Sequence, residues 1–273
     1  MTIFDLYMMG KKEVKNKSDL ILLFKSVFRL DRIGISLNSD LEVTDQQKKI
    51  FLNKLKKIKN DIPIHYVIGN VDFFDFNFRC GKGVFIPRKE TELLVKEVIQ
   101  KFGINFNGNI VDLCAGTGNV GISIKKALKK ANVVCIEKSP EAFKYLEYNN
   151  INMQVDVKCV LGDIFDQVNE FKDNTFDVIV SNPPYVKTFD ISYLDKNVQY
   201  EPRLALDGGN DGLDFYRKIL SMWKEKLKDD GFFAFEIGYD QYEDMGKIIK
   251  NEDLKNIQFI KDFNGYNRIC ICF

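Results

Sequence analysis

Hydrophobic side chains in the first 60 residues recur at the spacing of α-helices and form two apolar stripes. The stripes consist of Leu20, Leu23, Phe24 and Val27, and of Phe51, Leu55 and Ile58. Ser18 precedes the first stripe and can act as a helix N-cap, while Thr44 and Gln47 have the spacing of a capping box before the second. The pattern predicts a small helical domain over residues 1–62.

The pattern changes between residues 66 and 86, where short apolar runs alternate with polar residues and glycines. The segments concerned are Tyr66-Val67-Ile68-Gly69, Phe74-Asp75-Phe76-Asn77-Phe78, Gly81-Lys82-Gly83 and Val84-Phe85-Ile86. Alternation is typical of a half-buried strand, and a glycine-rich triplet is typical of a turn. We therefore expect a β-hairpin in a linker over residues 63–88, and a structural role there for the single histidine, His65.

From Asn109 onward, short apolar runs alternate with segments of helical periodicity. The predicted strands cover residues 110–114, 133–137, 155–160, 176–180 and 232–237, with helices between them. This alternation predicts an α/β domain over residues 89–273, with a mostly parallel sheet and helices on both faces. The last two apolar runs, 257–261 and 268–273, flank the turn Asn264-Gly265, which predicts an antiparallel end to the sheet.

Composition narrows the class of protein. The chain has 273 residues, of which 45% are hydrophobic and 29% charged, so a disordered or low-complexity chain is excluded. No apolar run approaches the roughly 18 to 20 residues of a membrane span, and Met1 to Lys15 lacks the features of a secretory signal. The six cysteines are scattered without a C-x-x-C pair, which favours reduced thiols. We expect a cytoplasmic protein with no membrane association and no bound metal.

Charge is unevenly distributed, although the net charge is only +1. Residues 1–70 hold 13 Lys and Arg against 8 Asp and Glu, so this part is basic and the remainder is acidic. A basic surface can favour an acidic or RNA-bearing partner. More often, such lysines form a solvated helix face, and the charge alone does not decide between these interpretations.

A glycine turn follows the first predicted strand of the α/β domain, at the edge where open parallel sheets bind their ligands. The turn is Asp112-Leu113-Cys114-Ala115-Gly116-Thr117-Gly118, and Gly121 completes a G-x-G-x-x-G spacing. A carboxylate at Asp112 repels a pyrophosphate and suits a cation. Glu137 ends the second strand about 20 residues on, where it can accept hydrogen bonds from ribose hydroxyls. S-adenosylmethionine has a ribose, an adenine and a cationic amino-acid end, and it satisfies all of these features.

A second polar segment, Ser181-Asn182-Pro183-Pro184-Tyr185, follows the fourth predicted strand. The prolines fix the backbone and remove two amide donors, so that carbonyl oxygens are left to face the cleft. The Asn182 side-chain oxygen and the Pro183 carbonyl can then accept both hydrogens of a planar NH2 group, on which Tyr185 stacks. These contacts orient a poorly nucleophilic nitrogen and stabilise the positive charge that develops on it during methyl transfer.

With these motifs, the sequence resembles the HemK/PrmC family, the protein-glutamine methyltransferases that act on peptide-chain release factors. The resemblance extends over essentially the whole chain, and its most specific segments are Ile86-Pro87-Arg88, Glu90-Thr91-Glu92, Asn182–Tyr185 and Tyr200-Glu201-Pro202. It implies a Rossmann-like class I S-adenosylmethionine-dependent methyltransferase domain and a helical substrate-recognition domain. It also implies a monomer, without a stable nucleic-acid partner, that methylates the N5 amide nitrogen of the Gly-Gly-Gln glutamine in class 1 release factors and releases S-adenosylhomocysteine.

The resemblance also assigns roles to individual positions. The residues implied to bind the cofactor are Asp112, Cys114, Ala115, Gly116, Thr117, Gly118, Glu137, Asp163, Ile164 and Asn182, and those implied to hold the glutamine amide are Asn182, Pro183, Pro184 and Tyr185. Within the first set, the turn lines the methionine end, Glu137 holds the ribose, and Asp163 and Ile164 border the adenine.

Three positions depart from the family pattern. Cys114 stands where glycine is common, which is tolerable if its backbone angles are ordinary. Glu137 replaces a common Asp, and Ile164 stands where some relatives carry an aromatic residue. We expect these changes to affect cofactor affinity more than the identity of the cofactor.

Three other interpretations use the same residues. An adenine amino-group DNA methyltransferase needs base flipping and a strongly basic recognition surface. The modest positive charge of residues 1–70 only weakly supports this interpretation. A ribosomal-protein glutamine methyltransferase would differ only in its helical domain. An RNA- or ribosome-associated binding module without turnover is disfavoured by the intact Asn182 and Glu137.

Overall fold

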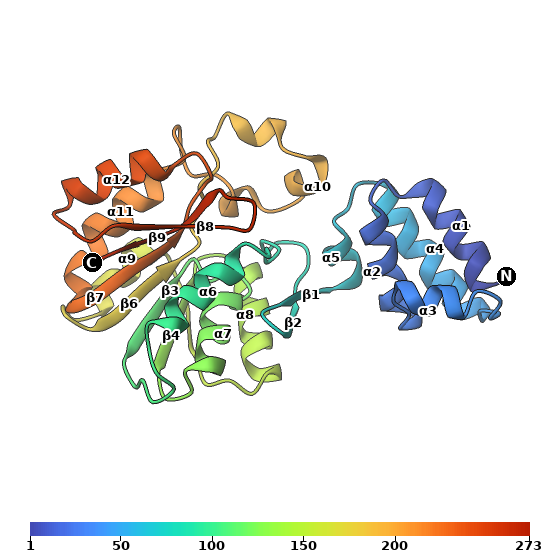
Figure 1. The fold of residues 1–273 in the computed structure, drawn as a ribbon, viewed down its shortest axis with the longest axis horizontal. Coiled ribbons are helices and arrows are strands. Elements are labelled where there is room, and N and C mark those ends of the chain that lie inside the picture. The colour runs from blue at the N-terminus through green and yellow to red at the C-terminus, as the bar shows by residue number, and fades with distance from the viewer. The chain divides into compact units, whose positions relative to one another are not determined.

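The computed structural model describes residues 1–273 and divides into two compact units (Figure 1). One unit comprises Met1–Asn70 together with Asp195–Tyr200, and the other comprises Val71–Leu194 with Glu201–Phe273. None of the helices combines the length and the apolar character that crossing a membrane requires.

The first unit is helical. Its helices are α1 (Ile3–Glu13), α2 (Lys17–Phe28), α3 (Arg32–Leu37), α4 (Asp45–Lys59), α5 (Ile64–Ile68) and the short α10 (Lys196–Gln199). Phe24 of α2 and Phe51 of α4 are both fully buried, with their ring centroids 5.0 Å apart in an edge-to-face arrangement. Tyr200 donates from its hydroxyl to the Asn60 carbonyl oxygen at 3.3 Å, which ties the distant segment 195–200 to this unit.

The predicted helix starts are partly correct. The capping box is confirmed, because Thr44 Oγ1 accepts from the Gln47 backbone N–H at 3.2 Å and Gln47 Oε1 accepts from the Thr44 backbone N–H at 3.0 Å. The prediction for Ser18 is wrong by two residues: Asn16 is the N-cap, and its Oδ1 accepts from the Ser18 N–H at 2.9 Å. Asn is as good a capping residue as Ser, and the apolar stripe alone does not decide between them.

The predicted hairpin is present but shorter than expected. Residues 64–68 form helix α5 rather than a strand, because a short apolar run does not distinguish the two. The strands are β1 (Asn70–Phe73) and β2 (Phe76–Arg79), and they turn at Phe74 and Asp75, both with positive φ. The triplet at 81–83 is not the hairpin turn, and residues 84–86 form a loop in which Val84 and Ile86 are buried. Burial in that loop, rather than strand pairing, explains the apolar run there.

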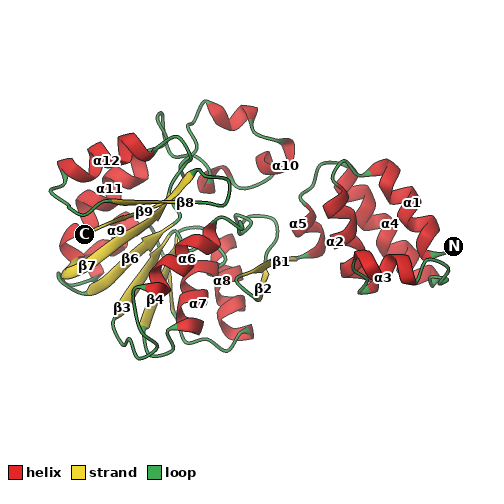
Figure 2. Cartoon of the chain, in the orientation of Figure 1, coloured by secondary structure: helices red, strands yellow, loops and turns green.

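The second unit is a sheet covered by helices on both faces (Figure 2). Its strands are β3 (Asn109–Leu113), β4 (Asn132–Glu137), β5 (Lys158–Leu161), β6 (Phe176–Ser181), β7 (Leu227–Glu236), β8 (Gln258–Lys261) and β9 (Asn267–Cys272). They lie in the order β5-β4-β3-β6-β7-β9-β8; the pairs among β3 to β7 are parallel, and β9 is antiparallel to both of its neighbours. The predicted α/β architecture with an antiparallel end is confirmed.

Six helices cover this sheet. They are α6 (Thr91–Gln100), α7 (Asn119–Ala127), α8 (Pro140–Asn152), α9 (Ile164–Gln167), α11 (Asp214–Trp223) and α12 (Tyr242–Asn251). Helices α6, α7 and α8 lie on one face and α9, α11 and α12 on the other (Figures 1 and 2). Short 3-10 turns occupy residues 168–170, 190–193, 203–205 and 224–226.

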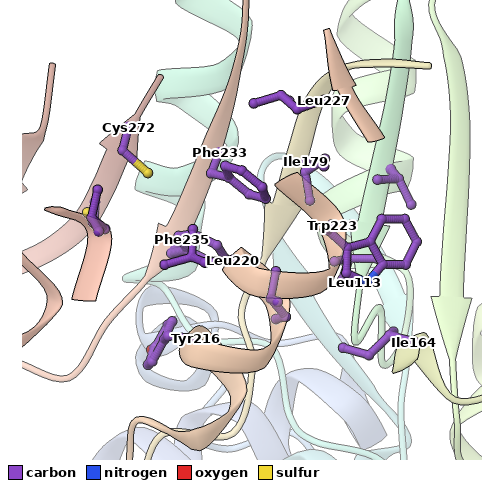
Figure 3. Packing of buried hydrophobic residues seen from close by; sticks show 14 of the residues in the cluster. Leu113, Ile164, Ile179, Tyr216, Leu220, Trp223, Leu227, Phe233, Phe235 and Cys272 are labelled. Atoms are coloured by element: carbon purple, nitrogen blue, oxygen red, sulfur yellow. The ribbon is translucent and has the colours of Figure 1, made fainter. Parts of the chain in front are cut away.

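One hydrophobic core lies between α11 and the sheet. Trp223 and Tyr216 of α11 are fully buried in this core (Figure 3). The Tyr216 ring packs edge-to-face on Phe235 of β7, and the Trp223 ring lies near Phe176 of β6, with centroid distances of 5.6 and 6.2 Å. Full burial of one large apolar side chain contributes roughly 1.5 to 3 kcal/mol. The Tyr216 hydroxyl donates to the backbone oxygen of Glu236 at 2.7 Å, so this core also fixes the carboxyl end of β7.

Gly121 allows α7 to approach the sheet closely. A Cβ at this position would lie 2.4 Å from Cys135 Sγ on β4 and 3.1 Å from Asp112 Oδ2 on β3. Both neighbours are buried side chains attached to strands and have little room to move. The third glycine of the G-x-G-x-x-G spacing is therefore required for packing between helix and strand.

We predict that Gly121→Ala lowers the free energy of unfolding by about 1 to 3 kcal/mol, because the added methyl group overpacks this contact. Urea denaturation measures the effect. The same substitution is also made in the Cys135→Ala variant, which lacks the sulfur atom closest to the added methyl group. Gly103→Ala is the control, since nothing lies within 4 Å of its Cβ position. An equal cost of Gly121→Ala in both backgrounds would contradict the contact.

Candidate active site

A pocket opens at the carboxyl ends of β3, β4 and β6, entirely within the α/β unit. Twelve of the residues singled out from the sequence line it: Asp112, Cys114, Ala115, Gly116, Thr117, Glu137, Asp163, Ile164, Asn182, Pro183, Pro184 and Tyr185. Gly118 is the exception. It adopts a left-handed conformation, with φ of 80°, at the N-terminus of α7 and packs beside Leu146 and Ile122.

The turn after β3 is built from left-handed residues. Gly116 has φ of 56° and Cys114 has φ of 63°. The condition under which Cys114 was tolerable is therefore not met, because a side chain in this conformation is strained by roughly 1 to 2 kcal/mol. Cys114 is half-buried and packs against the core between α11 and the sheet, and burial raises the pKa of its thiol.

At most positions an alanine variant is more stable than a glycine variant, and the strain at Cys114 reverses this order of stability. We predict that Cys114→Gly is more stable to urea than Cys114→Ala by about 1 kcal/mol, because only glycine adopts this φ without strain. Cys159 of β5 is also half-buried and has no positive φ, so the Gly and Ala variants there should show the ordinary order. An alanine variant at 114 that is as stable as the glycine variant would show that the turn carries no strain.

Asp112 lies deep at one end of the pocket. Its side chain is 1% exposed, and its Oδ2 accepts from the Gly121 N–H at 2.8 Å, so the first turn of α7 holds the carboxylate. Burial raises the pKa of Asp112 to about 7; the Gly121 hydrogen bond opposes this rise and the charge of Glu137 adds to it. A cation placed beside Asp112 would favour the ionised form.

Glu137 accepts backbone hydrogen bonds through both carboxylate oxygens, one from the turn after β3 and one from the residues that follow β4. Its Oε2 accepts from the Gly116 N–H and its Oε1 from the Ser139 N–H, each at 2.7 Å. Burial raises the pKa of Glu137, and these backbone hydrogen bonds oppose the rise. Each carboxylate oxygen has a second lone pair, so both retain capacity to accept a ligand hydroxyl.

Another part of the pocket lining is apolar apart from one ion pair. Asp163 caps α9 by accepting from the Phe165 N–H at 3.0 Å, and it pairs with Lys138 Nζ at 2.7 Å. Ile164 is almost fully buried, and Phe165 and Phe215 line the pocket beside it with ring centroids 5.7 Å apart. The pocket lining therefore combines a buried carboxylate at Asp112 with an apolar surface at Ile164 and the two aromatic rings.

The segment after β6 presents polar atoms to the pocket. Pro183 and Pro184 are buried, and Asn182 and Tyr185 are half-buried. Asn182 donates from Nδ2 to Thr91 Oγ1 at 3.3 Å, and Thr91 in turn donates to Glu236 Oε2 at 2.5 Å. The Tyr185 hydroxyl donates to Glu236 Oε1 at 3.3 Å.

Two loops are joined beside the pocket by Glu201. This buried carboxylate accepts from the Ile86 N–H at 2.9 Å and forms an ion pair with Arg88. Arg88 also lies over the Phe85 ring, 4.7 Å from its centroid, but it does not line the pocket. Phe85 and Pro87 do line it, as do Leu204 and Leu206 from the loop that follows Glu201.

Sequence reasoning missed several residues of this site. Phe165 could have been found, because it follows Asp163 and Ile164 and supplies an aromatic side chain one position later than expected. Thr91 was recognised only as part of a motif, without a role. Glu236 ends β7 directly after the apolar run 232–235, and nothing in the local sequence connects it with Asn182 or Tyr185.

Comparisons with known proteins agree with this architecture. Residues 76–196 match the methyltransferase small domain family, and residues 11–69 match the PrmC N-terminal domain family. A methyltransferase from Pyrococcus furiosus has a similar fold, with a TM-score of 0.53 and 18% sequence identity over 84% of this chain and 98% of that one.

Two curated relatives extend over nearly the whole chain. The release factor glutamine methyltransferase of Clostridium acetobutylicum is 36% identical over 93% of this chain and 90% of its own length. That of Clostridium botulinum is 35% identical over 98% of both chains. The resemblance found in the sequence is thus confirmed: the chain belongs to the family of release factor glutamine methyltransferases.

Proposed function

We propose that this protein transfers a methyl group from S-adenosylmethionine to the side-chain amide nitrogen, N5, of the Gly-Gly-Gln glutamine in class 1 peptide-chain release factors. The observation that carries the proposal is that Asp112, Glu137 and the Asn182–Tyr185 segment line one pocket in a chain of this family. S-adenosylhomocysteine is the other product.

The residues that line the pocket match the three parts of S-adenosylmethionine: its ammonium group, its ribose and its adenine ring. Asp112 can pair with the ammonium group of the cofactor, and Glu137 can accept hydrogen bonds from its ribose hydroxyls. Ile164 and Phe165 provide the apolar surface that an adenine ring needs. The cofactor supplies an electrophilic methyl group on a positively charged sulfur.

Residues 182–185 prepare the accepting nitrogen. An amide nitrogen is a poor nucleophile because its lone pair is delocalised into the carbonyl group. The Asn182 Oδ1 and the Pro183 carbonyl oxygen accept its two hydrogens, which orients the nitrogen and stabilises the positive charge that develops on it. Burial raises the pKa of Tyr185, so its ring stays neutral and offers a flat surface to the glutamine amide. The proton leaves to water after transfer.

The helical unit is proposed to recognise the release factor. Residues 11–69 match the N-terminal domain that is specific to this family, whereas the methyltransferase domain is of a more general type. We assign residues 1–62 to recognition, 63–88 to the linker and 89–273 to catalysis. Release factors act on ribosomes, so the reaction belongs in the cytoplasm, with the enzyme acting as a monomer and without a stable nucleic-acid partner.

Mass spectrometry tests this function directly. A release factor is incubated with the protein and S-adenosylmethionine, and its peptides are searched for one added methyl group on the Gly-Gly-Gln glutamine. One methyl group there supports the proposal. No methyl group, with cofactor binding shown by calorimetry, refutes it and favours a ribosomal-protein glutamine or an adenine amino group as the acceptor.

We predict that Asn182→Ala lowers kcat for methyl transfer at least about 100-fold, because the acceptor for one amide hydrogen is lost. The Kd for S-adenosylmethionine should change little, since Asp112 and Glu137 remain. Asn169→Ala, at an exposed site outside the pocket, is the matched control. Turnover near that of the unmodified protein would rule out this role for Asn182.

We also predict that cofactor affinity rises with pH. The pKa of Asp112 is about 7 in the free protein, and only the ionised carboxylate pairs with the cofactor ammonium group. Binding therefore releases a proton, and below that pKa the affinity should fall about tenfold per pH unit. Calorimetry between about pH 6 and pH 8 measures this dependence, and Asp112→Asn should bind more weakly and lose it. The same slope in Asp112→Asn would assign the proton to another group.

A further inference from the structure

A buried carboxylate outside the pocket holds both ends of the Asn-Pro-Pro-Tyr segment. Glu236, the last residue of β7, is 1% exposed and does not line the pocket. Its Oε2 accepts from Thr91, which contacts Asn182, and its Oε1 accepts from Tyr185. Thr91, the first residue of α6, is itself 1% exposed and lines the pocket, so the connection runs from the pocket wall to the buried Glu236.

We propose that Thr91 and Glu236 are positioning residues, which turn the Asn182 amide so that its oxygen, rather than its NH2 group, faces the methyl-accepting nitrogen. This inference rests on the proposed function, because it assigns the orientation of a side chain that the proposed reaction uses. It extends that function to two residues that need not touch the acceptor nitrogen or the transferred methyl group.

The orientation of an asparagine amide needs a partner to set it. The oxygen and the NH2 group are nearly equal in size, so packing alone does not distinguish the two ends. If the NH2 group faced the substrate, two donors would meet and the glutamine amide would lose an acceptor. A correct orientation is therefore as important to the reaction as the presence of Asn182.

The relay from Glu236 to Thr91 decides between the two orientations. An ionised carboxylate only accepts hydrogen bonds, and a threonine hydroxyl has a single proton to give. Thr91 donates that proton to Glu236 at 2.5 Å, so only its lone pairs remain for Asn182. Asn182 must then present its NH2 group to Thr91, as it does at 3.3 Å, which leaves Oδ1 as the free end of the amide.

Two hydroxyl donors, those of Thr91 and Tyr185, face the two oxygens of the Glu236 carboxylate, as its role as an acceptor requires. Burial raises its pKa, and the charge of Glu90 adds to the rise. The Thr91 hydrogen bond, the charge of Arg268 and the Tyr185 hydrogen bond all lower its pKa. The backbone oxygen of Glu236 is held in addition by the buried Tyr216 hydroxyl, so the carboxylate is attached to a rigid strand end.

The test compares variants that remove only the hydroxyl group. Thr91→Val keeps the shape of the side chain and should lower kcat for release-factor methylation by about 10- to 100-fold, with a Kd for S-adenosylmethionine within about twofold of the unmodified protein. Thr91→Ser keeps the hydroxyl and should stay within about threefold in kcat. Thr175→Val loses a hydroxyl that binds the Lys172 carbonyl outside the pocket, and should not change turnover.

Several outcomes overturn the proposal. It fails if Thr91→Val retains kcat, or if Thr91→Ser loses as much as Thr91→Val. If Thr91→Val does not fold, Thr91→Ala and Thr91→Ser replace the pair, because both lack the methyl group and only serine has the hydroxyl. Equal kcat values for those two variants also reject the relay.

A second measurement does not depend on methyl transfer. In protein carrying 15N-labelled asparagine and bound S-adenosylhomocysteine, the Asn182 side-chain NH2 signals are assigned by their absence in Asn182→Ala. Their exchange with water should be slow in the unmodified protein, several-fold faster in Thr91→Val, and slow again in Thr91→Ser. Unchanged exchange in Thr91→Val rejects the relay. If the unmodified protein does not methylate a release factor, the proposed function fails and this exchange alone decides the orientation.

Discussion

The parallel pairing of β3, β4, β6 and β7 brings the chemistry of this protein to one place. Leu113 of β3 lies beside Ile136 of β4 and Ser181 of β6, and Ser181 in turn lies beside Phe235 of β7. The residues that come next in the chain after these four positions are Cys114, Glu137, Asn182 and Glu236. A shift of any one of these strands by a single residue would turn its own side chains to the opposite face of the sheet and remove its contribution from the site. The site therefore depends on strand register before it depends on any single side chain.

Such an arrangement concentrates buried acidic groups. Asp112, Glu137 and Glu236 are each at least nine-tenths buried, which is costly for ionised carboxylates. The structure offsets this cost with donors: backbone N–H groups at Asp112 and Glu137, and two hydroxyl groups at Glu236. In the proposed complex, the ammonium group and the ribose of the cofactor complete the partners of the first two carboxylates. Glu236 needs no ligand, which fits a carboxylate that supports its neighbours and does not react.

Features with a local cause were predictable from the sequence. The alternation of strands and helices, the Thr44–Gln47 capping box and the twelve pocket-lining residues that the motifs contain are each read from a single segment of the chain. The helix at 64–68 and the left-handed turn at Phe74 and Asp75 were not, because short apolar runs do not specify the backbone conformation. The strain at Cys114 was missed because a cysteine gives no sign of positive φ. Thr91 and Glu236 lie 145 positions apart, and only the folded chain brings them to one another.

The segment Asp195–Tyr200 makes the helical unit discontinuous in sequence. The polypeptide leaves the α/β unit after Leu194, adds α10 to the helical unit, and returns at Glu201, whose carboxylate joins two pocket loops. The units are consequently linked by three peptide connections rather than one, and no single cut separates them. Tyr200, which donates to Asn60 in the helical unit, is joined by one peptide bond to Glu201, and the loop that follows Glu201 lines the pocket. Cleavage of the chain between residues 70 and 71 would therefore leave part of the helical unit, the 195–200 segment, covalently joined to the α/β unit.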